Sequence, residues 1–109
     1  MDLSQAEKSL DQFLHNLPKS IRVEEVIIFG SYLEGNATED SDIDVYVVSE
    51  DFENQDEDQR LRALYKAARF IEPEVHPWGV TNEELKRASR LTTLGYACES
   101  GIRFLDRRR

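Results

Sequence analysis

One stretch near the middle of the chain constrains the fold more than any other part of the sequence. It reads VIIFGSYLEGNATEDSDIDVYVV and runs from Val26 to Val48. Two apolar, strand-like runs enclose a Gly-Ser dipeptide and an Asp-x-Asp pair, Asp42 and Asp44. Residues two apart in a strand point to the same face, so these two carboxylates project together while the residue between them points to the core. The sequence therefore predicts two strands that bracket a glycine turn and a pair of acids.

The same stretch indicates a class of chemistry. Gly30 allows a backbone conformation or a close approach that a side chain would block. Ser31, with the N–H groups at the start of a short helical turn, is suited to bind phosphate oxygens. Asp42 and Asp44 are suited to hold Mg²⁺ on a triphosphate. We therefore expect a magnesium-dependent transfer of a nucleotidyl or phosphoryl group; in nucleotidyl transfer the attack falls at the α-phosphorus and pyrophosphate leaves.

A metal site of this kind needs a third acid. Glu72 and Glu74 share parity with His76 and Trp78 on a third strand that is expected from Pro73 to Trp78. We favour Glu74, expected in mid-strand, as the acid that completes the metal site and activates the attacking hydroxyl, with Glu72 as the alternative. His76 is interpreted as a partly buried histidine, and a role beside the acids is the alternative.

Size and charge limit the possible functions. A chain of 109 residues makes one small domain, and a net charge of −8 argues against a polynucleotide substrate. No apolar run is long enough for a membrane span, and the N-terminal residues do not resemble a signal peptide. Cys98 is the single cysteine, so a cytoplasmic location is expected. The acidic run from Glu50 to Asp58 is interpreted as a solvated loop that leads into a helix, and a docking patch for a basic partner is the alternative.

The rest of the pattern predicts the remaining elements of an α/β domain. Apolar periodicity and capping residues predict helices at Ser4 to Leu17, Asp58 to Ile71, Thr81 to Ser89 and Thr92 to Glu99, a helical turn at Ser31 to Gly35, strands at Arg22 to Phe29 and Asp42 to Ser49, and a short apolar tail at Ile102 to Leu105. Pro73 and Pro77 have the same parity, which leaves one edge of the third strand for pairing.

At these residues the chain resembles the minimal nucleotidyltransferase family of the DNA polymerase β-like superfamily. The matching residues are Gly30-Ser31, Asp42 and Asp44, with Glu74 as the third acid and Gly101-Ile102 as a closing segment. The resemblance implies a single domain over residues 1–109 with its core at about 22–105, a small mixed sheet with helices packed on one side, Mg²⁺ as cofactor and ATP as substrate. Glu34 stands where members of the family often carry a basic or neutral residue.

The resemblance also implies a partner. Many members of this size are similar to antitoxins that pair with an all-helical HEPN toxin and transfer AMP to one of its tyrosines. Two alternatives stay open from the sequence. One is a non-catalytic antitoxin that acts by occlusion. The other is an enzyme that modifies a small hydroxylated molecule such as an aminoglycoside, for which the acidic surface is suited.

Overall fold

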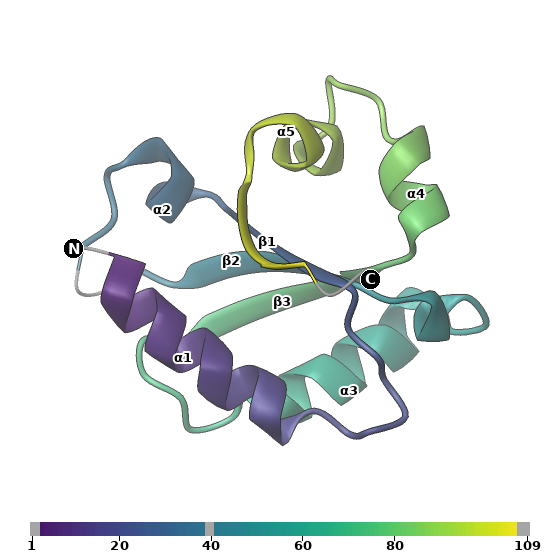
Figure 1. The fold of residues 1–109 in the computed structure, drawn as a ribbon, viewed down its shortest axis with the longest axis horizontal. Coiled ribbons are helices and arrows are strands. Elements are labelled where there is room, and N and C mark those ends of the chain that lie inside the picture. Colours follow the sequence, from purple (N-terminus) through teal and green to yellow (C-terminus); the bar gives the residue numbers. More distant parts are fainter. Residues whose placement is uncertain (1–2, 39–40, 107–109) are drawn as a thin grey trace.

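The computed structural model describes residues 3–38 and 41–106, and within them helices and strands are packed in layers (Figure 1). The helices are α1 (Leu3–Asn16), α2 (Ser31–Glu34), α3 (Glu57–Ala68), α4 (Asn82–Arg87) and α5 (Thr93–Ser100), with a short 3-10 helix, η1 (Glu50–Phe52). The strands are β1 (Glu25–Phe29), β2 (Ile43–Val48), β3 (Val75–Val80) and β4 (Ile102–Asp106). In the described part of the chain, no helix has the length and apolar character that crossing a bilayer requires.

The strands form one mixed sheet in the order β3-β2-β1-β4. Strand β1 pairs antiparallel with β2 and β4, whereas β2 and β3 are parallel and are connected through η1 and α3. The parallel pairing is closed at its two ends by hydrogen bonds from Ile43 N–H to the Glu74 carbonyl and from Ser49 N–H to the Val80 carbonyl. The backbone N–H and C=O groups of the even-numbered residues of β3 thus point toward β2. The backbone nitrogen of Pro77, which carries no hydrogen, points to the open edge of the sheet, as predicted. The expected small mixed α/β fold is confirmed.

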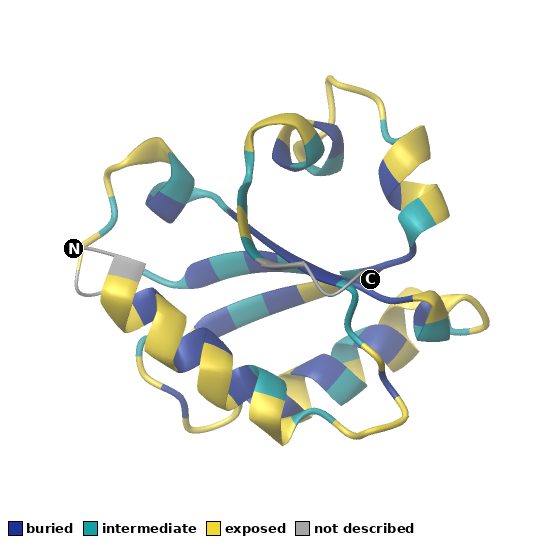
Figure 2. Cartoon of the chain, in the orientation of Figure 1, coloured by how far each residue is buried: buried dark blue, intermediate teal, exposed yellow. Residues whose placement is uncertain are grey.

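The two faces of the sheet have different cover. Helices α1 and α3 pack on one face, where the larger core contains Phe13, Val45, Val47 and Leu64. Figure 2 shows the buried stripe of α1 turned toward the sheet. On the other face, α4 and α5 cover one end of the sheet over a smaller cluster that includes Ile27. The expectation of helices on one side is thus corrected, because alternate apolar residues of β1 and β2 require cover on both faces.

Several element boundaries also differ from the sequence prediction, among them the start of β1, which is Glu25 and not Arg22, and the end of α3, which is Ala68 and not Ile71. The expected tail from Ile102 is strand β4, which pairs with β1 at the edge of the sheet. Strand β3 begins at Val75, so Glu74 lies just before the strand and not in its middle. Helix α3 begins earlier than expected because Asp56 and Gln59 form a capping box, in which each side chain accepts a hydrogen bond from the other's backbone N–H.

A buried arginine ties the second layer of helices to the rest of the molecule. Arg60 of α3 is 8 % exposed, and its guanidinium donates to the carbonyls of Phe52 and Gly79 and to both carboxylate oxygens of Glu84 in α4. Glu84 also completes the predicted capping box with Thr81 at the start of α4. The hydrogen bond from Arg60 lowers the pKa of Glu84 below its ordinary value of 4.5, although partial burial opposes the shift.

Replacing Glu84 with glutamine should lower the free energy of unfolding at neutral pH by on the order of 1 kcal/mol, since a half-exposed carboxylate is screened by water. The folded pKa of Glu84 lies below the unfolded one, so its stabilisation is fully present above the unfolded value and is lost as pH falls through the folded value. Urea unfolding between about pH 7 and pH 3 should therefore show the difference shrinking with acid.

Glu83→Gln is the matched control, because Glu83 pairs at 2.7 Å with the exposed Arg87 of the same helix. A deficit for Glu84→Gln that did not change with pH would contradict a charged pair between Glu84 and Arg60.

Candidate active site

The predicted glycine turn lies directly against one of the predicted acids. Phe29 at the end of β1 is opposite Asp44 in β2. Gly30 follows in a left-handed conformation, with φ 74° and ψ −145°, and Ser31 begins α2. A Cβ atom built on Gly30 would overlap Asp44 Oδ2 and would lie 3.2 Å from Asp44 Cγ. Glycine is therefore required at this position for two reasons. It adopts the backbone conformation without strain, and it leaves room for the Asp44 carboxylate.

Four polar side chains gather where β2 and β3 begin. Asp42 and Asp44 lie on the same side of β2, as predicted, because Ile43 between them is fully buried in the opposite core. His76 is the neighbour of Asp44 in the parallel register. Its Nε2 atom lies 3.4 Å from Asp42 Oδ2 and 3.8 Å from Glu74 Oε2.

The geometry separates the two candidates for the third acid. Among the described residues, possible metal-ligand atoms of Asp42, Glu74 and His76 lie within 4.8 Å of one another, and neither Glu72 nor the predicted ligand Asp44 is part of this group. The Glu74 side chain is 61 % exposed, so a molecule from solution can reach it. The catalytic role of Glu74 stays a prediction, but its carboxylate lies beside the Asp pair.

His76 takes both positions that the sequence left open. It is half-buried, as expected, and its ring nitrogen lies between two carboxylates of the site, which was the alternative. The pairing of β3 with β2 places it next to Asp44.

Local electrostatics distinguish Asp44 from the other acids. Partial burial raises the pKa of Asp44, the neighbouring His76 opposes this shift, and the charge of Asp42 adds to it. Burial, followed by the charge of Asp44, also raises the pKa of Tyr46. A cation placed between Asp42 and Asp44 would relieve the repulsion between their carboxylates. A pair of neighbouring carboxylates therefore favours a bound metal ion or a protonated group.

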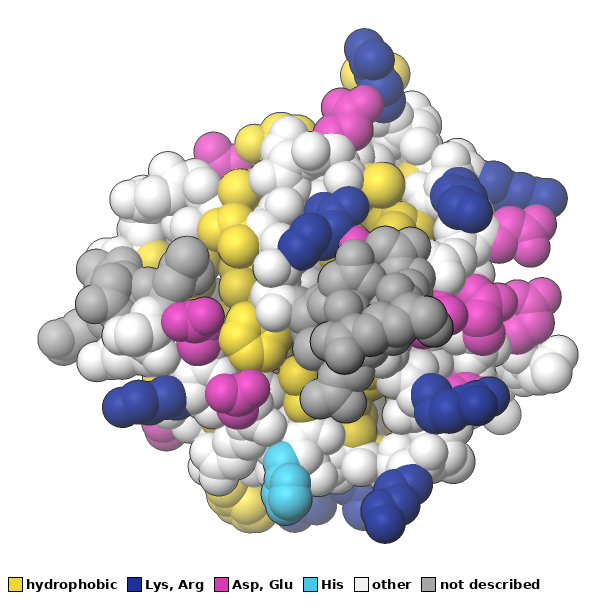
Figure 3. All heavy atoms as spheres, viewed as in Figure 1, with side chains coloured by type: hydrophobic (Ala, Val, Ile, Leu, Met, Phe, Trp, Pro, Cys, Tyr) yellow, Lys and Arg dark blue, Asp and Glu magenta, His cyan; other side chains and the backbone are white. Residues whose placement is uncertain are grey.

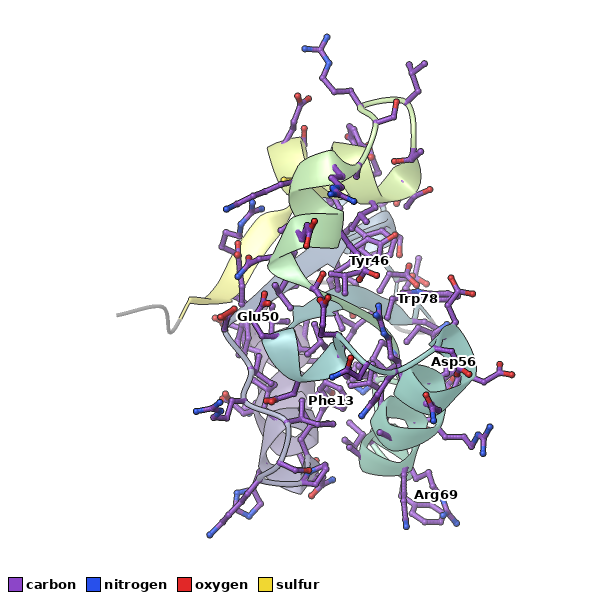
Figure 4. The ribbon with its side chains drawn as sticks, turned by 90° about the vertical axis from the view of Figure 1, so that its right-hand side faces the viewer. Phe13, Tyr46, Glu50, Asp56, Arg69 and Trp78 are labelled. Atoms are coloured by element: carbon purple, nitrogen blue, oxygen red, sulfur yellow. The ribbon has the colours of Figure 1, made fainter. Side chains whose placement is uncertain are left out.

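An aromatic row continues the site toward α4 and α5. The rings of Phe29 and Tyr46 are stacked with centroids 4.6 Å apart, and Tyr46 is next to Trp78 in the register of β2 and β3. Figure 4 shows Tyr46 and Trp78 on the side of the sheet that faces α4, away from Phe13. Trp78 is 44 % exposed and offers a flat apolar surface beside the acids. Tyr32 of α2 is buried in the larger core and is not part of this row.

Glu34, the unusual acid near the turn, is tied to the last helix of the domain. The hydroxyl of Tyr96 in α5 donates a hydrogen bond of 2.9 Å to Glu34 Oε1 at the end of α2. The same bond raises the pKa of Tyr96. It directs the Glu34 side chain toward α5 and joins α2 to the helices over the other end of the sheet.

The acidic run after β2 has structural partners. Asp51 accepts a hydrogen bond of 2.7 Å from the backbone N–H of Arg22, and Asp56 caps α3. Figure 3 shows acidic side chains at the edge of the molecule where η1 and α4 lie in Figure 1. The interpretation of this run as a loop that leads into a helix is confirmed for Asp56.

Comparison with known proteins agrees with this geometry. The family model described as "Nucleotidyltransferase domain" matches residues 7–97. The chain belongs to the nucleotidyltransferase domain family. The match includes the glycine turn, both aspartates and Glu74, and it confirms the nucleotidyltransferase resemblance that the sequence motif carried.

Three similar proteins extend the comparison. A protein of Methanocaldococcus jannaschii named "Putative protein adenylyltransferase" is 40 % identical over 46 residues, which are 40 % of this chain and 46 % of that protein, so the match spans under half of the relative's length. A "putative nucleotidyltransferase" from Sulfolobus solfataricus has a TM-score of 0.65 at 21 % identity over 98 % of this chain and 82 % of its own, which shows the fold. A structure described as "the toxin-antitoxin with AMP-PNP" has a TM-score of 0.60 at 25 % identity, covering 94 % and 74 %.

Replacing Gly30 with alanine should destabilise the protein more than the same change at Gly35. Gly35 is also left-handed, with φ 78°, but a Cβ there would have no neighbour within 4 Å. We expect Gly35→Ala to cost about 1 kcal/mol, and Gly30→Ala to cost roughly 1–3 kcal/mol more, because it adds a rarer conformation and displaces Asp44. Urea unfolding of the two variants checks this, and equal costs would contradict the contact between Gly30 and Asp44.

Proposed function

We propose that this protein is an Mg²⁺-dependent adenylyltransferase that transfers AMP from ATP to a hydroxyl group of a partner protein. The acceptor is a tyrosine of a HEPN-domain toxin, and the protein acts as its antitoxin in the cytoplasm. The observation that carries the proposal is the contact of the Gly30 turn with Asp44, on the same face as Asp42 and Glu74. It sets a phosphate-binding backbone beside the Asp44 carboxylate, and Asp42 and Glu74 lie around His76, the register neighbour of Asp44; phosphate-binding groups beside carboxylates are what transfer of a nucleotidyl group needs.

The glycine turn binds the triphosphate. Backbone N–H groups at the start of α2, together with the Ser31 hydroxyl, donate hydrogen bonds to phosphate oxygens. Gly30 presents no side chain, so phosphate and carboxylate can lie close to the same stretch of backbone. The aromatic surface of Trp78 and Tyr46 is on the same face of the sheet and is available to the rest of the nucleotide.

The donor set fits Mg²⁺. Asp42 and Glu74, whose ligand atoms lie within 4.8 Å of each other, and Asp44, the register neighbour of His76, would hold the ion through carboxylate oxygens, the ligands that Mg²⁺ prefers. When bound, the ion would neutralise phosphate charge and polarise the α-phosphoryl group. Imidazole nitrogen is a poorer ligand for this ion, so His76 orients the carboxylates of Asp42 and Glu74 from 3.4 and 3.8 Å.

Glu74 serves the acceptor. In the transfer, the hydroxyl oxygen forms a bond to the α-phosphorus while the bond from that phosphorus to the bridging oxygen breaks and pyrophosphate leaves. The hydroxyl proton passes to the Glu74 carboxylate, the most exposed of the three acids and the one that an acceptor from solution meets first.

A macromolecular acceptor suits the shape of the domain. The acids lie at an open end of the sheet, while α4 and α5 cover the other end. A partner protein would complete the walls that one small domain does not supply. The similarity to a toxin–antitoxin structure with AMP-PNP and to a protein named as an adenylyltransferase supports a partner and a nucleotide.

Incubation with α-labelled ATP, Mg²⁺ and the helical partner encoded beside this protein should add one or more AMP units to the partner, detected by intact mass. The combined variant Asp42→Ala, Asp44→Ala should reduce labelling to background, and so should chelation of the metal, because both remove the charge that binds the triphosphate. Toxin neutralisation that survives the double change would instead support inhibition by occlusion.

The third acid can be tested separately with a matched pair of variants. Glu74→Gln should lower the transfer rate by about a hundredfold or more, the usual contribution of a general base, with little effect on complex formation. Glu72→Gln, two residues away and equally exposed to solvent, should leave the rate within about twofold of wild type. If Glu72→Gln instead lowers the transfer rate at saturating ATP and Glu74→Gln does not, the general base is Glu72.

A further inference from the structure

The outward side of α3 has a basic and aromatic surface in a protein whose net charge is −8. We define this α3 surface as Leu61, Arg62, Tyr65, Lys66, Arg69 and Phe70. Among the ion pairs of the described residues, none involves Arg62, Lys66 or Arg69. Asp58 lies at the N-terminal end of this surface, and the described residues that line it toward the C-terminal end of the helix are basic or aromatic. This surface can therefore attract carboxylates from another molecule.

Phe70 is held outward in an unfavourable backbone conformation. It follows the last turn of α3 with φ 65°, at a helix end where glycine commonly takes the left-handed conformation. A bulky residue is rare in that region. Its side chain is 91 % exposed, and the Arg69 guanidinium lies 5.3 Å from the ring centroid. Packing within the domain does not explain this side chain, whereas contact with another molecule does.

The α3 surface opens onto the acids of the candidate site. A groove of about 410 Å³ is lined by Tyr65, Arg69 and Phe70 of this surface and also by Glu74. A second hollow of about 540 Å³ on the outer side of α3 shares Tyr65 and Arg69 with this groove and includes Lys66. Figure 4 shows Arg69 at the end of α3 that points away from α4. A chain seated on α3 would thus lead to the carboxylate that we assign to the acceptor.

We propose that the α3 surface docks an acidic polypeptide segment of the acceptor protein and delivers a hydroxyl group of that segment to Glu74. The inference rests on the proposed AMP transfer. Carboxylates of the segment pair with the three cations, and its apolar side chains pack on Phe70 and Tyr65. A nucleic acid is disfavoured as the occupant because each nucleotide carries a phosphate, which Glu72 and Glu74 in the same groove would repel, whereas a polypeptide can place its carboxylates on the three cations and neutral residues beside these two acids.

The test uses a random copolymer of glutamate and tyrosine, labelled with fluorescein, and measures its binding by anisotropy. Phe70→Gly and Lys66→Glu should each weaken binding by about tenfold or more. Leu91→Ser and Lys86→Glu are the matched controls and should leave binding unchanged, since Leu91 is 98 % exposed in a loop and Lys86 lies in the last turn of α4. Glycine adopts φ 65° without strain, so Phe70→Gly should keep or raise the melting temperature and loss of binding cannot be ascribed to unfolding.

Docking and chemistry are measured separately. The Asp42→Ala, Asp44→Ala variant should bind the copolymer at least as tightly as wild type while transferring no label from α-labelled ATP. Binding without any transfer by the wild-type protein would thus reject the AMP transfer and retain the docking surface. The docking proposal is overturned if the wild type does not bind the copolymer or if Phe70→Gly binds it equally well. It is also overturned if a single-stranded oligonucleotide binds more tightly than the copolymer and loses its affinity in Phe70→Gly.

Discussion

The close approach of Gly30 to Asp44 is the constraint on which the rest of the site depends. It depends on the register between β1 and β2, in which Phe29 lies opposite Asp44 and the turn therefore meets the carboxylate. The register in turn decides which residues of β2 face the open side of the sheet. The parallel pairing of β3 then brings His76 next to Asp44 and Glu74 close to Asp42. One backbone contact thus joins a phosphate-binding turn to acids from two further segments.

Division of the sheet into a covered and a partly open face explains how a small domain keeps such a site stable. The core between the sheet, α1 and α3 is apolar and fully buried at Ile43, Val45 and Val47. On the opposite face only one end of the sheet is covered, by α4 and α5, and Arg60 and Glu84 connect α4 to α3 around the edge of the sheet. Repulsion between the acids is tolerated because the strands that bear them are anchored from the other side.

The part of the site that could be predicted from the sequence is the part that depends on local geometry. Asp42 and Asp44 share a face because side chains alternate along any strand, and Gly30 was identified because a glycine after a buried strand suggests a special turn. The position of His76 needed the pairing partner of β3, which parity alone does not give. Strand β4 was expected as a tail because its partner, β1, lies far away in the sequence. The conformation of Phe70 could not be predicted either, because glycine is the residue usually found in that conformation after the end of a helix such as α3.

The most direct test of the central claim is a crystal structure with a non-hydrolysable ATP analogue and Mn²⁺, whose anomalous scattering locates the metal. We expect anomalous peaks coordinated by Asp42 and Asp44, with phosphate oxygens on the backbone of Gly30 and Ser31. Metal at the acidic run between Glu50 and Asp58, or a triphosphate bound away from the Gly30 turn, would contradict it.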